Sequence, residues 1–213
     1  MTNPLLAFHS DSAIKAKYLA RVQAHAKADE IIHGAYWQNG KGCALGCTIH
    51  GDDHEAYERE LGIPQSLAWL EDCIFEGLPN GDAKVFPAAF LMAIKPGANL
   101  SKVTSLFLLA VQRRNLRRMR GNEPVTDAIR LCILVLQNWS QGKLDETAAR
   151  NAESAAWSAR SAAAVARRAV NSAAAVSAAW SAAWSARSAA GSAAWSAEYK
   201  WMGKTLLNLL RSA

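Results

Sequence analysis

The tract from residue 145 to residue 198 is dominated by alanine and serine with recurring tryptophans, and it constrains the fold more than any other part of the sequence. The stretch SAAWSARSAA begins at Ser154 and occurs again, letter for letter, at Ser181. Alanine is the strongest helix former, so the tract is predicted to be helical. One unbroken helix of this length would extend roughly 80 Å, whereas a compact chain of this size has a radius of gyration of about 17 Å. The tract must therefore project as a rod or fold back, and Asn171-Ser172 favours a helical hairpin with its turn there.

The repeat also predicts what one face of these helices presents. The serines from 177 to 196 are spaced 4, 4, 3, 4 and 4 residues apart, which gives eleven residues for three turns. Small residues on one face let another helix approach closely, and Trp180, Trp184 and Trp195 border that face. The face is predicted to pack helices within the chain. The alternative is a docking surface for a partner or for a second copy, because tryptophans are favoured interface anchors.

The rest of the chain is predicted to be helical as well, because its apolar residues recur at helical spacing and no stretch alternates with the period of a strand. The fold class is therefore all-α, with a region of short helices at 1–144 and the long Ala/Ser/Trp-rich helices at 145–213, packed together as one domain. A Gly/Cys loop at 35–53 interrupts the first region. The expected helices cover 10–33, 54–61, 64–76, 85–94, 102–120 and 127–139.

Composition narrows the functional classes. The chain has 24 Lys and Arg against 18 Asp and Glu, a net charge of +6, which suits an acidic protein surface or a nucleic acid. Its four cysteines are too few for a disulfide framework at this length, so the thiols are expected to be reduced, in the cytoplasm. No apolar run is long enough to cross a bilayer, so no membrane association is expected.

The Gly/Cys loop carries the densest set of metal-ligating side chains. Cys43, Cys47, His50 and His54 follow the spacing C-x3-C-x2-H-x3-H. Two thiolates and two imidazoles are a tetrahedral zinc set, although zinc fingers separate the two pairs by more residues. The alternatives are small buried cysteines beside ordinary surface histidines, or a thiol–histidine catalytic pair. Zinc is the one cofactor that the sequence suggests.

The same loop is also a candidate anion site. Its glycines and lysine, in the stretch GKGCALG, could direct backbone amides and an ammonium group at a phosphate or carboxylate, as in a nucleotide. The spacing is not that of a P-loop, and a structural turn is the alternative. The residues concerned are Gly40, Lys41, Gly42 and Gly46.

A cluster of arginines ends the helix expected at 102–120, and it comprises Arg113, Arg114, Arg117, Arg118 and Arg120. Arginines near a helix C-terminus complement the helix dipole, which accounts for them structurally. They are also candidate contacts for nucleic acid or an acidic partner. The stretch from Tyr57 to Gly77 has the rhythm of a helix-turn-helix, but its second helix carries Glu71, Asp72 and Glu76, which would repel DNA phosphates.

Four stretches together, GKGCALGCTIH, YERELGIP, LEDCIFEGLPN and PGANLSKV, resemble a family of proteins carried by bacterial phages and prophages. The closing KWMGKTLLNLL fits the same family, and the Ala-rich tail is more loosely similar to helical immunity proteins of bacterial toxin systems. The resemblance implies a context of conflict between mobile elements and their hosts. It implies no activity and no catalytic residues.

These features predict a non-enzymatic binding protein, an inhibitor or neutraliser in phage–host or toxin–immunity conflict, whose partner is a bacterial defence component or toxin. The first alternative is a small-ligand, nucleotide or zinc-binding protein centred on residues 41–54. The second is a protein that binds nucleic acid without sequence specificity through the arginine cluster at 113–120.

Overall fold

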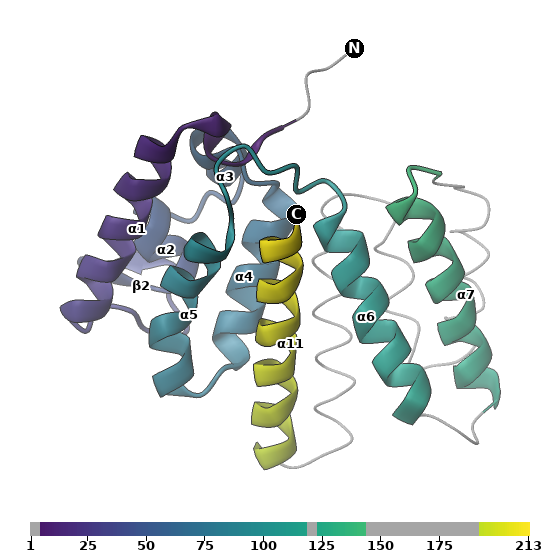
Figure 1. Ribbon diagram of the computed structural model, residues 1–213. Helices are drawn as coiled ribbons and strands as arrows, with labels where there is room; N and C mark the ends of the chain where they lie inside the picture. The colour runs from purple at the N-terminus through teal and green to yellow at the C-terminus, as the bar shows by residue number, and fades with distance from the viewer. Residues whose placement is uncertain (1–4, 119–122, 144–191) are drawn as a thin grey trace. The chain divides into compact units, whose positions relative to one another are not determined.

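The computed structural model describes residues 5–118, 123–143 and 192–213 (Figure 1). Within these ranges the regular structure is helical apart from one two-stranded hairpin, which confirms the all-α prediction. No helix in these ranges is long and apolar enough to cross a membrane. The predicted turn at Asn171-Ser172 and most of the predicted helical hairpin lie outside the described residues, as do Trp180, Trp184 and Arg120, whereas its last part is the helix Ser192–Ser212.

The chain forms two compact units: the first unit is Met1–Val103 with Tyr199–Ala213, and the second unit is Thr104–Glu198. The predicted division between residues 144 and 145 falls outside the described ranges. The C-terminal helix α11 (Ser192–Ser212) begins in the second unit and contributes its residues from Tyr199 onward to the first.

The first unit begins with a short 3-10 helix, η1 (Ala7–Ser10), followed by α1 (Ser12–Lys27). Asp11 caps α1 by accepting a hydrogen bond from the amide of Ala13 at 2.7 Å. The predicted helix 10–33 was too long, because Asp29 adopts a left-handed conformation with φ 58° and the next residues leave the helix. The backbone of Ile31 instead forms a bridge with Gly42.

The Gly/Cys loop supplies the only sheet in the described part of the chain, β1 (Trp37–Gln38) and β2 (Lys41–Gly42), which pair antiparallel. The prediction of a loop throughout 35–53 is wrong in part, because residues Ala44–Ile49 form the helix α2 after the hairpin; α3 (Ala56–Leu61) follows. The predicted helix at 54–61 is confirmed in its main part. Gly62 ends α3 with φ 62°, where a side chain would be strained.

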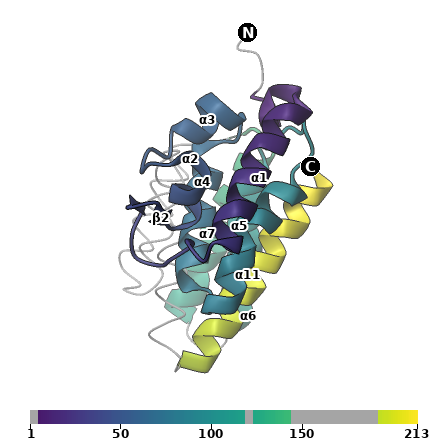
Figure 2. The same cartoon turned by 90° about the vertical axis from the view of Figure 1, so that its left-hand side faces the viewer.

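The helix at the centre of the first unit is α4 (Gln65–Gly77), which Pro64 precedes. Its side chains at Leu67, Leu70 and Ile74 are fully buried. It packs against α2 and α5, and α1 packs against the same two helices (Figure 2). This central helix therefore contacts the end of the Gly/Cys loop through α2.

Helix α5 (Asn80–Ala93) begins five residues before the predicted start at residue 85. Pro79 presets the backbone at its entry, with φ −59°, and Asp82 in the first turn complements the helix dipole. The C-terminal part of α11 packs against the same unit, since Gly77 at the end of α4 lies against the ring of Tyr199. Gly203 lies against the ring of Phe86 in the same way.

The described helices of the second unit are α6 (Val103–Arg118), α7 (Glu123–Ser140) and the start of α11. The predictions at 102–120 and 127–139 locate α6 and α7 correctly but miss the first turn of α7. Among the described residues of this unit, the buried side chains include Phe107, Leu108, Val111, Ile129, Cys132 and Leu136.

Candidate functional site

The Gly/Cys loop is folded by its own backbone. Trp37 pairs with Gly42 and Gln38 with Lys41, and the turn between them is Asn39-Gly40. Both turn residues have positive φ, 53° and 81°, which matches the two-residue hairpin turn that Asn-Gly favours. The part of the loop from Trp37 to Gly42 is therefore a defined hairpin.

Gly46 allows α2 to lie directly against this hairpin. A Cβ atom at that position would lie 1.4 Å from the carbonyl oxygen of Tyr36, so no other residue fits without moving the backbone. The contact fixes Tyr36 against the first turn of α2. It explains one of the glycines that the sequence marked as an anion-binding residue.

The four predicted anion-site residues, Gly40, Lys41, Gly42 and Gly46, lie in the hairpin and in α2. The amide of Gly42 donates to the carbonyl of Glu30 at 3.0 Å. The amide of Gly46 donates to the Sγ atom of Cys43 at 3.5 Å. Because both amides are used within the chain, the geometry favours the structural alternative for these two glycines.

Both cysteines of the loop are buried and reduced. The Cys47 thiol donates to the carbonyls of Gly42 at 3.3 Å and Glu30 at 3.7 Å. The Cys43 thiol faces α4, where its Sγ atom lies within 4.8 Å of a carboxylate oxygen of Asp72. Burial raises the pKa of Cys47 to about 12, and burial followed by the charge of Asp72 raises the pKa of Cys43. Neither thiol is therefore an exposed nucleophile at neutral pH.

His50 is held in a strained conformation on the outside of the loop. It ends α2 with φ 58°, a position that glycine usually occupies. Its ring stacks on Trp37, with centroids 4.4 Å apart, and its Nε2 atom lies 2.8 Å from Nε2 of His25. Glu30 in turn contacts Nδ1 of His25 at 2.6 Å. Burial, followed by the charge of Arg21, lowers the pKa of His50.

His54 lies inside the protein. Its ring stacks on Trp69 with centroids 3.4 Å apart and an interplanar angle of 8°, and Tyr36 contacts it edge-on at 5.5 Å. The side chain is 4% exposed, and its Nε2 atom lies 3.9 Å from Oδ2 of Asp72. That nitrogen has no hydrogen-bond partner.

The structure therefore does not bring the four predicted zinc ligands to one point. Cys47 and His50 face Glu30 and Trp37, whereas Cys43 and His54 face α4. The Cys47 thiol is held by the carbonyls of Gly42 and Glu30, and His50 leaves α2 in a left-handed conformation that stacks its ring on Trp37. Cys43 and His54, which are half of the predicted set, each approach the carboxylate of Asp72.

Three carboxylates of α4 line the inner side of the loop. Glu71 is fully buried and Asp72 is 6% exposed. The hydroxyl of Tyr57 donates to Glu71 at 2.6 Å, and burial raises the pKa of Glu71 to about 8. Glu76 accepts from the amide of Gly34 with both oxygens, at 3.0 and 3.1 Å. One oxygen of Glu71 and one of Asp72 have no hydrogen-bond partner.

The sequence was compared with protein-family models, curated proteins and solved structures. No match was found. The geometry of the chain's own side chains is thus the basis for any function.

A cavity of about 390 Å³ opens beside the hairpin. Tyr36 belongs to its lining and also contacts His54, so the cavity lies next to the buried cluster. Burial and the charges of Asp72, Cys43 and Glu76 raise the pKa of Tyr36, which keeps its hydroxyl protonated. The lining residues are Ala35, Tyr36, Trp37, Gln38, Gly51 and Asp52.

The arginines of α6 divide into two pairs. Arg114 binds both oxygens of Glu198, at 3.0 and 3.1 Å, and Arg118 binds the same carboxylate at 2.7 Å. Glu198 is 4% exposed, so the carboxylate of this ion pair network is buried, whereas its arginines lie half-buried or exposed. Arg113 and Arg117 are exposed instead.

Of the tryptophans predicted as partner contacts, Trp195 is the one that the structure describes, and it lies half-buried on α11.

The sequence reasoning missed Asp72 and Glu76 as functional candidates, because it read the acids of α4 only as groups that would repel DNA. A signal for a buried acid was present only at the neighbouring Glu71. Glu71 follows Leu67 by four residues and precedes Ile74 by three, so it lies on the apolar face of its helix. Acids in such a helix need a partner inside the protein.

Proposed function

We propose that the protein is a non-enzymatic binding protein, an inhibitor or neutraliser in phage–host or toxin–immunity conflict, which recognises an acidic surface of a bacterial protein in the cytoplasm. The recognition surface is the second unit. One observation carries the proposal: the net charge of the chain is confined to that unit. The phage-family resemblance supplies the biological context.

The two units differ sharply in charge. Residues 104–198 contain twelve Lys and Arg against six Asp and Glu, whereas the first unit contains twelve of each. The whole net charge of +6 thus belongs to the second unit. A surface with an excess of one sign attracts partners of the opposite sign and accelerates their association.

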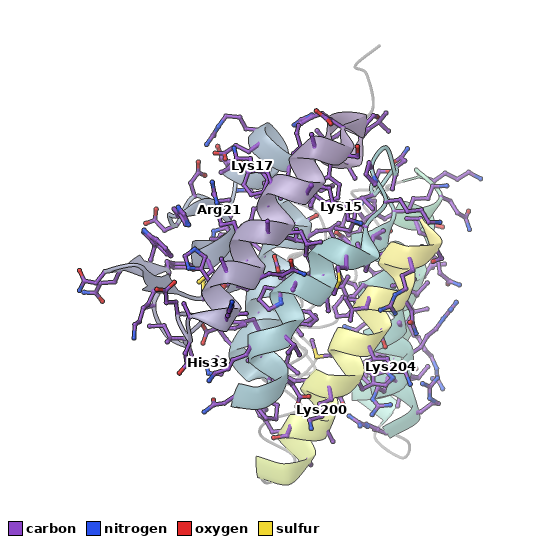
Figure 3. All side chains as sticks on the ribbon, turned by 60° about the vertical axis from the view of Figure 1, so that its left-hand side comes forward. Lys15, Lys17, Arg21, His33, Lys200 and Lys204 are labelled. Atoms are coloured by element: carbon purple, nitrogen blue, oxygen red, sulfur yellow. The ribbon has the colours of Figure 1, made fainter. Side chains whose placement is uncertain are left out.

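In the first unit, several basic side chains are used within the fold. The Lys15 ammonium donates to the carbonyls of Met92 at 3.0 Å and Ile94 at 2.6 Å. Arg21 donates to the carbonyl of Thr48 at 2.8 Å, and Lys200 pairs with Asp82 at 2.9 Å. Figure 3 shows these cations on α1 and α11, together with the exposed Lys17 and Lys204.

In the second unit, Arg113 and Arg117 are the pair best placed for a partner. They are one helical turn apart on α6, so their side chains lie on the same face. Both are exposed, whereas Arg114 and Arg118 are held by Glu198. Interfaces favour arginine because its planar guanidinium binds carboxylates with two parallel hydrogen bonds.

Helix α7 adds exposed apolar surface to the same unit. Leu131 and Leu134 are 39% and 52% exposed, and they lie three residues apart on one face. Protein interfaces combine an apolar centre with charged residues around it. Binding to the phosphates of a nucleic acid, by contrast, would require the arginines but not the exposed leucines.

The experiment uses two double variants that remove the same charge. Arg113→Gln/Arg117→Gln removes two exposed cations from the second unit, and Lys17→Gln/Lys204→Gln removes two exposed cations from the first. Each full-length protein is used for affinity capture from bacterial lysate, and any captured partner is purified. One-to-one complex formation is then measured by size-exclusion chromatography and titration calorimetry.

We expect the arginine variant to weaken binding of an acidic partner at least tenfold and the lysine variant to leave it unchanged. Equal effects of the two variants, or loss with the lysine variant alone, would refute recognition by the second unit. Binding to DNA or RNA instead, with an affinity that falls steeply with salt, would replace the protein partner by nucleic acid.

A further inference from the structure

One trio of ligand atoms lies inside the first unit, where the Gly/Cys loop meets α4. The Sγ atom of Cys43 and one carboxylate oxygen each of Asp72 and Glu76 lie within 4.8 Å of one another. Cys43 is 1% exposed and Asp72 is 6% exposed. Two ligands of one tetrahedral zinc ion lie about 3.5 Å apart, given bonds of about 2.0 to 2.3 Å. The distances between the three ligand atoms therefore need to shorten by only about 1 Å for them to bind one ion.

His54 directs an unused nitrogen at Asp72 from beside this trio, and the imidazole must come closer to bind the same ion. Its Nε2 atom is buried, has no hydrogen-bond partner, and lies 3.9 Å from Oδ2 of Asp72. The stacking on Trp69 fixes the plane of the ring. A buried polar atom without a partner costs free energy unless something occupies the position that it faces. The Oδ1 atom of Asp72 lacks a partner as well.

Charge balance also points to a cation. Asp72 and Glu76 lie beside the third acid, Glu71, and no ion pair in the described part of the chain joins any of the three to a lysine or arginine. Buried carboxylates are normally paired or bound to a metal. A cation bound at Asp72 would satisfy the unpaired oxygen of Asp72 and the unpaired nitrogen of His54 together.

From this geometry we propose that Cys43, His54, Asp72 and Glu76 form a zinc-binding site between the Gly/Cys loop and α4. One sulfur, one imidazole nitrogen and two carboxylate oxygens suit Zn²⁺, whereas Ca²⁺ and Mg²⁺ take oxygen ligands. With four protein ligands the site is closed, so its role is structural: the metal ties the loop to the central helix.

When Zn²⁺ binds, the Cys43 thiol must lose its proton. The Cys43 thiol gives its proton to solvent, and the thiolate forms the bond to Zn²⁺. Backbone amides support the ligands from outside: Gly46 donates to the sulfur at 3.5 Å, and Gly34 donates to the Glu76 carboxylate at 3.0 and 3.1 Å. Outer hydrogen bonds of this kind orient metal ligands.

This set differs from the one that the sequence spacing suggested, and the difference gives the test its control. Cys47 and His50 belong to the spacing motif but face Glu30 and Trp37. The site is also independent of the proposed partner surface, because all four ligands belong to the first unit.

The experiment starts from full-length protein stripped of metal with a chelator under reducing conditions. Zn²⁺ is titrated by calorimetry and by competition with a zinc indicator, and Co²⁺ is used as a spectroscopic probe. The ligand variants are Cys43→Ser and Asp72→Asn, and the control variants are Cys47→Ser and His50→Asn. Circular dichroism shows that each variant is folded.

We expect one Zn²⁺ per chain and a thiolate-to-cobalt absorption band in the near ultraviolet. The ligand variants should weaken Zn²⁺ binding beyond the 10- to 100-fold that is typical of outer-shell substitutions, and the control variants should bind within about threefold of the wild type. If a ligand variant does not fold, the cobalt band of the wild type, retained in Cys47→Ser, still shows that the bound thiolate is not Cys47.

Three results would overturn the site. The first is no stoichiometric Zn²⁺ binding to the folded wild type. The second is binding that depends on Cys47 and His50 but not on Asp72, which would restore the motif predicted from spacing. The third is binding of Ca²⁺ or Mg²⁺ in preference to Zn²⁺, without a thiolate band.

Discussion

Replacing Gly77 with alanine should disrupt the packing of α11 on α4. A Cβ atom at Gly77 would lie 2.1 Å from Cε1, 2.2 Å from Cζ and 2.3 Å from Cδ1 of Tyr199. Carbon atoms in contact normally lie about 3.5 to 4.0 Å apart, so the tyrosine ring must move by roughly 1.5 Å. Tyr199 is 2% exposed and has little room to do so.

The expected magnitude follows from two opposing effects. Overpacking of a core costs about 1–3 kcal/mol, and alanine in place of glycine regains up to about 1 kcal/mol of helix propensity. The net loss in unfolding free energy should be about 1–2 kcal/mol. At this chain length that lowers the melting temperature by roughly 2–8 °C.

Urea and thermal unfolding, followed by circular dichroism and tryptophan fluorescence, measure this loss. Gly81→Ala is the matched control, because a Cβ atom there meets nothing within 4 Å. It should be neutral or stabilising by up to about 1 kcal/mol. The double variant Gly77→Ala/Tyr199→Ala should be no less stable than Tyr199→Ala alone, since the clash is gone. If Gly77→Ala is as stable as Gly81→Ala, the close packing inferred for Tyr199 is wrong.

Three further predictions concern single contacts. Glu198→Gln should destabilise the second unit by about 1–3 kcal/mol in urea unfolding, because Arg114 and Arg118 lose a buried carboxylate. Unchanged stability would show that these ion pairs are dispensable. Burial and a hydrogen bond to Glu60 raise the pKa of Tyr18 to about 12. The folded state therefore holds this proton more tightly than the unfolded state, and stability should fall as the pH rises from 10 to 12. Tyr18→Phe should remove that part of the fall in pH-dependent unfolding, and an identical slope would contradict it. Asp11→Ala removes the cap of α1 and should cost about 1 kcal/mol, whereas the same change at the exposed Asp52 should cost little.

Most of the helical framework was predictable from the sequence because its signals are local. Gly62 and Pro64 mark the boundary between α3 and α4, and both helices were expected close to where they lie. Helix ends were harder. The periodic spacing of Ile32 extended the first predicted helix beyond Asp29, where the backbone turns and pairs with Gly42 instead. That pairing is not encoded in nearby residues.

The candidate site was predictable only in part. Cys43 and His54 were identified because they lie close together in a motif, but Asp72 and Glu76 come from a helix that the sequence places far along the chain. Their approach depends on the packing of α2 against α4. The division of the arginines of α6 was likewise hidden, because Glu198 lies about eighty residues beyond them.

The composition of the first unit has a consequence for how the chain is made. Its N-terminal part leaves the ribosome early, but Tyr199–Ala213 is translated only after Thr104–Glu198. Until then, the surface around Gly77 and Phe86 lacks the helix that covers it in the finished protein. A nascent chain should therefore expose an apolar face that chaperones and proteases recognise. A premature stop before residue 199 would leave that face permanently uncovered, so truncated products should be degraded rather than accumulate.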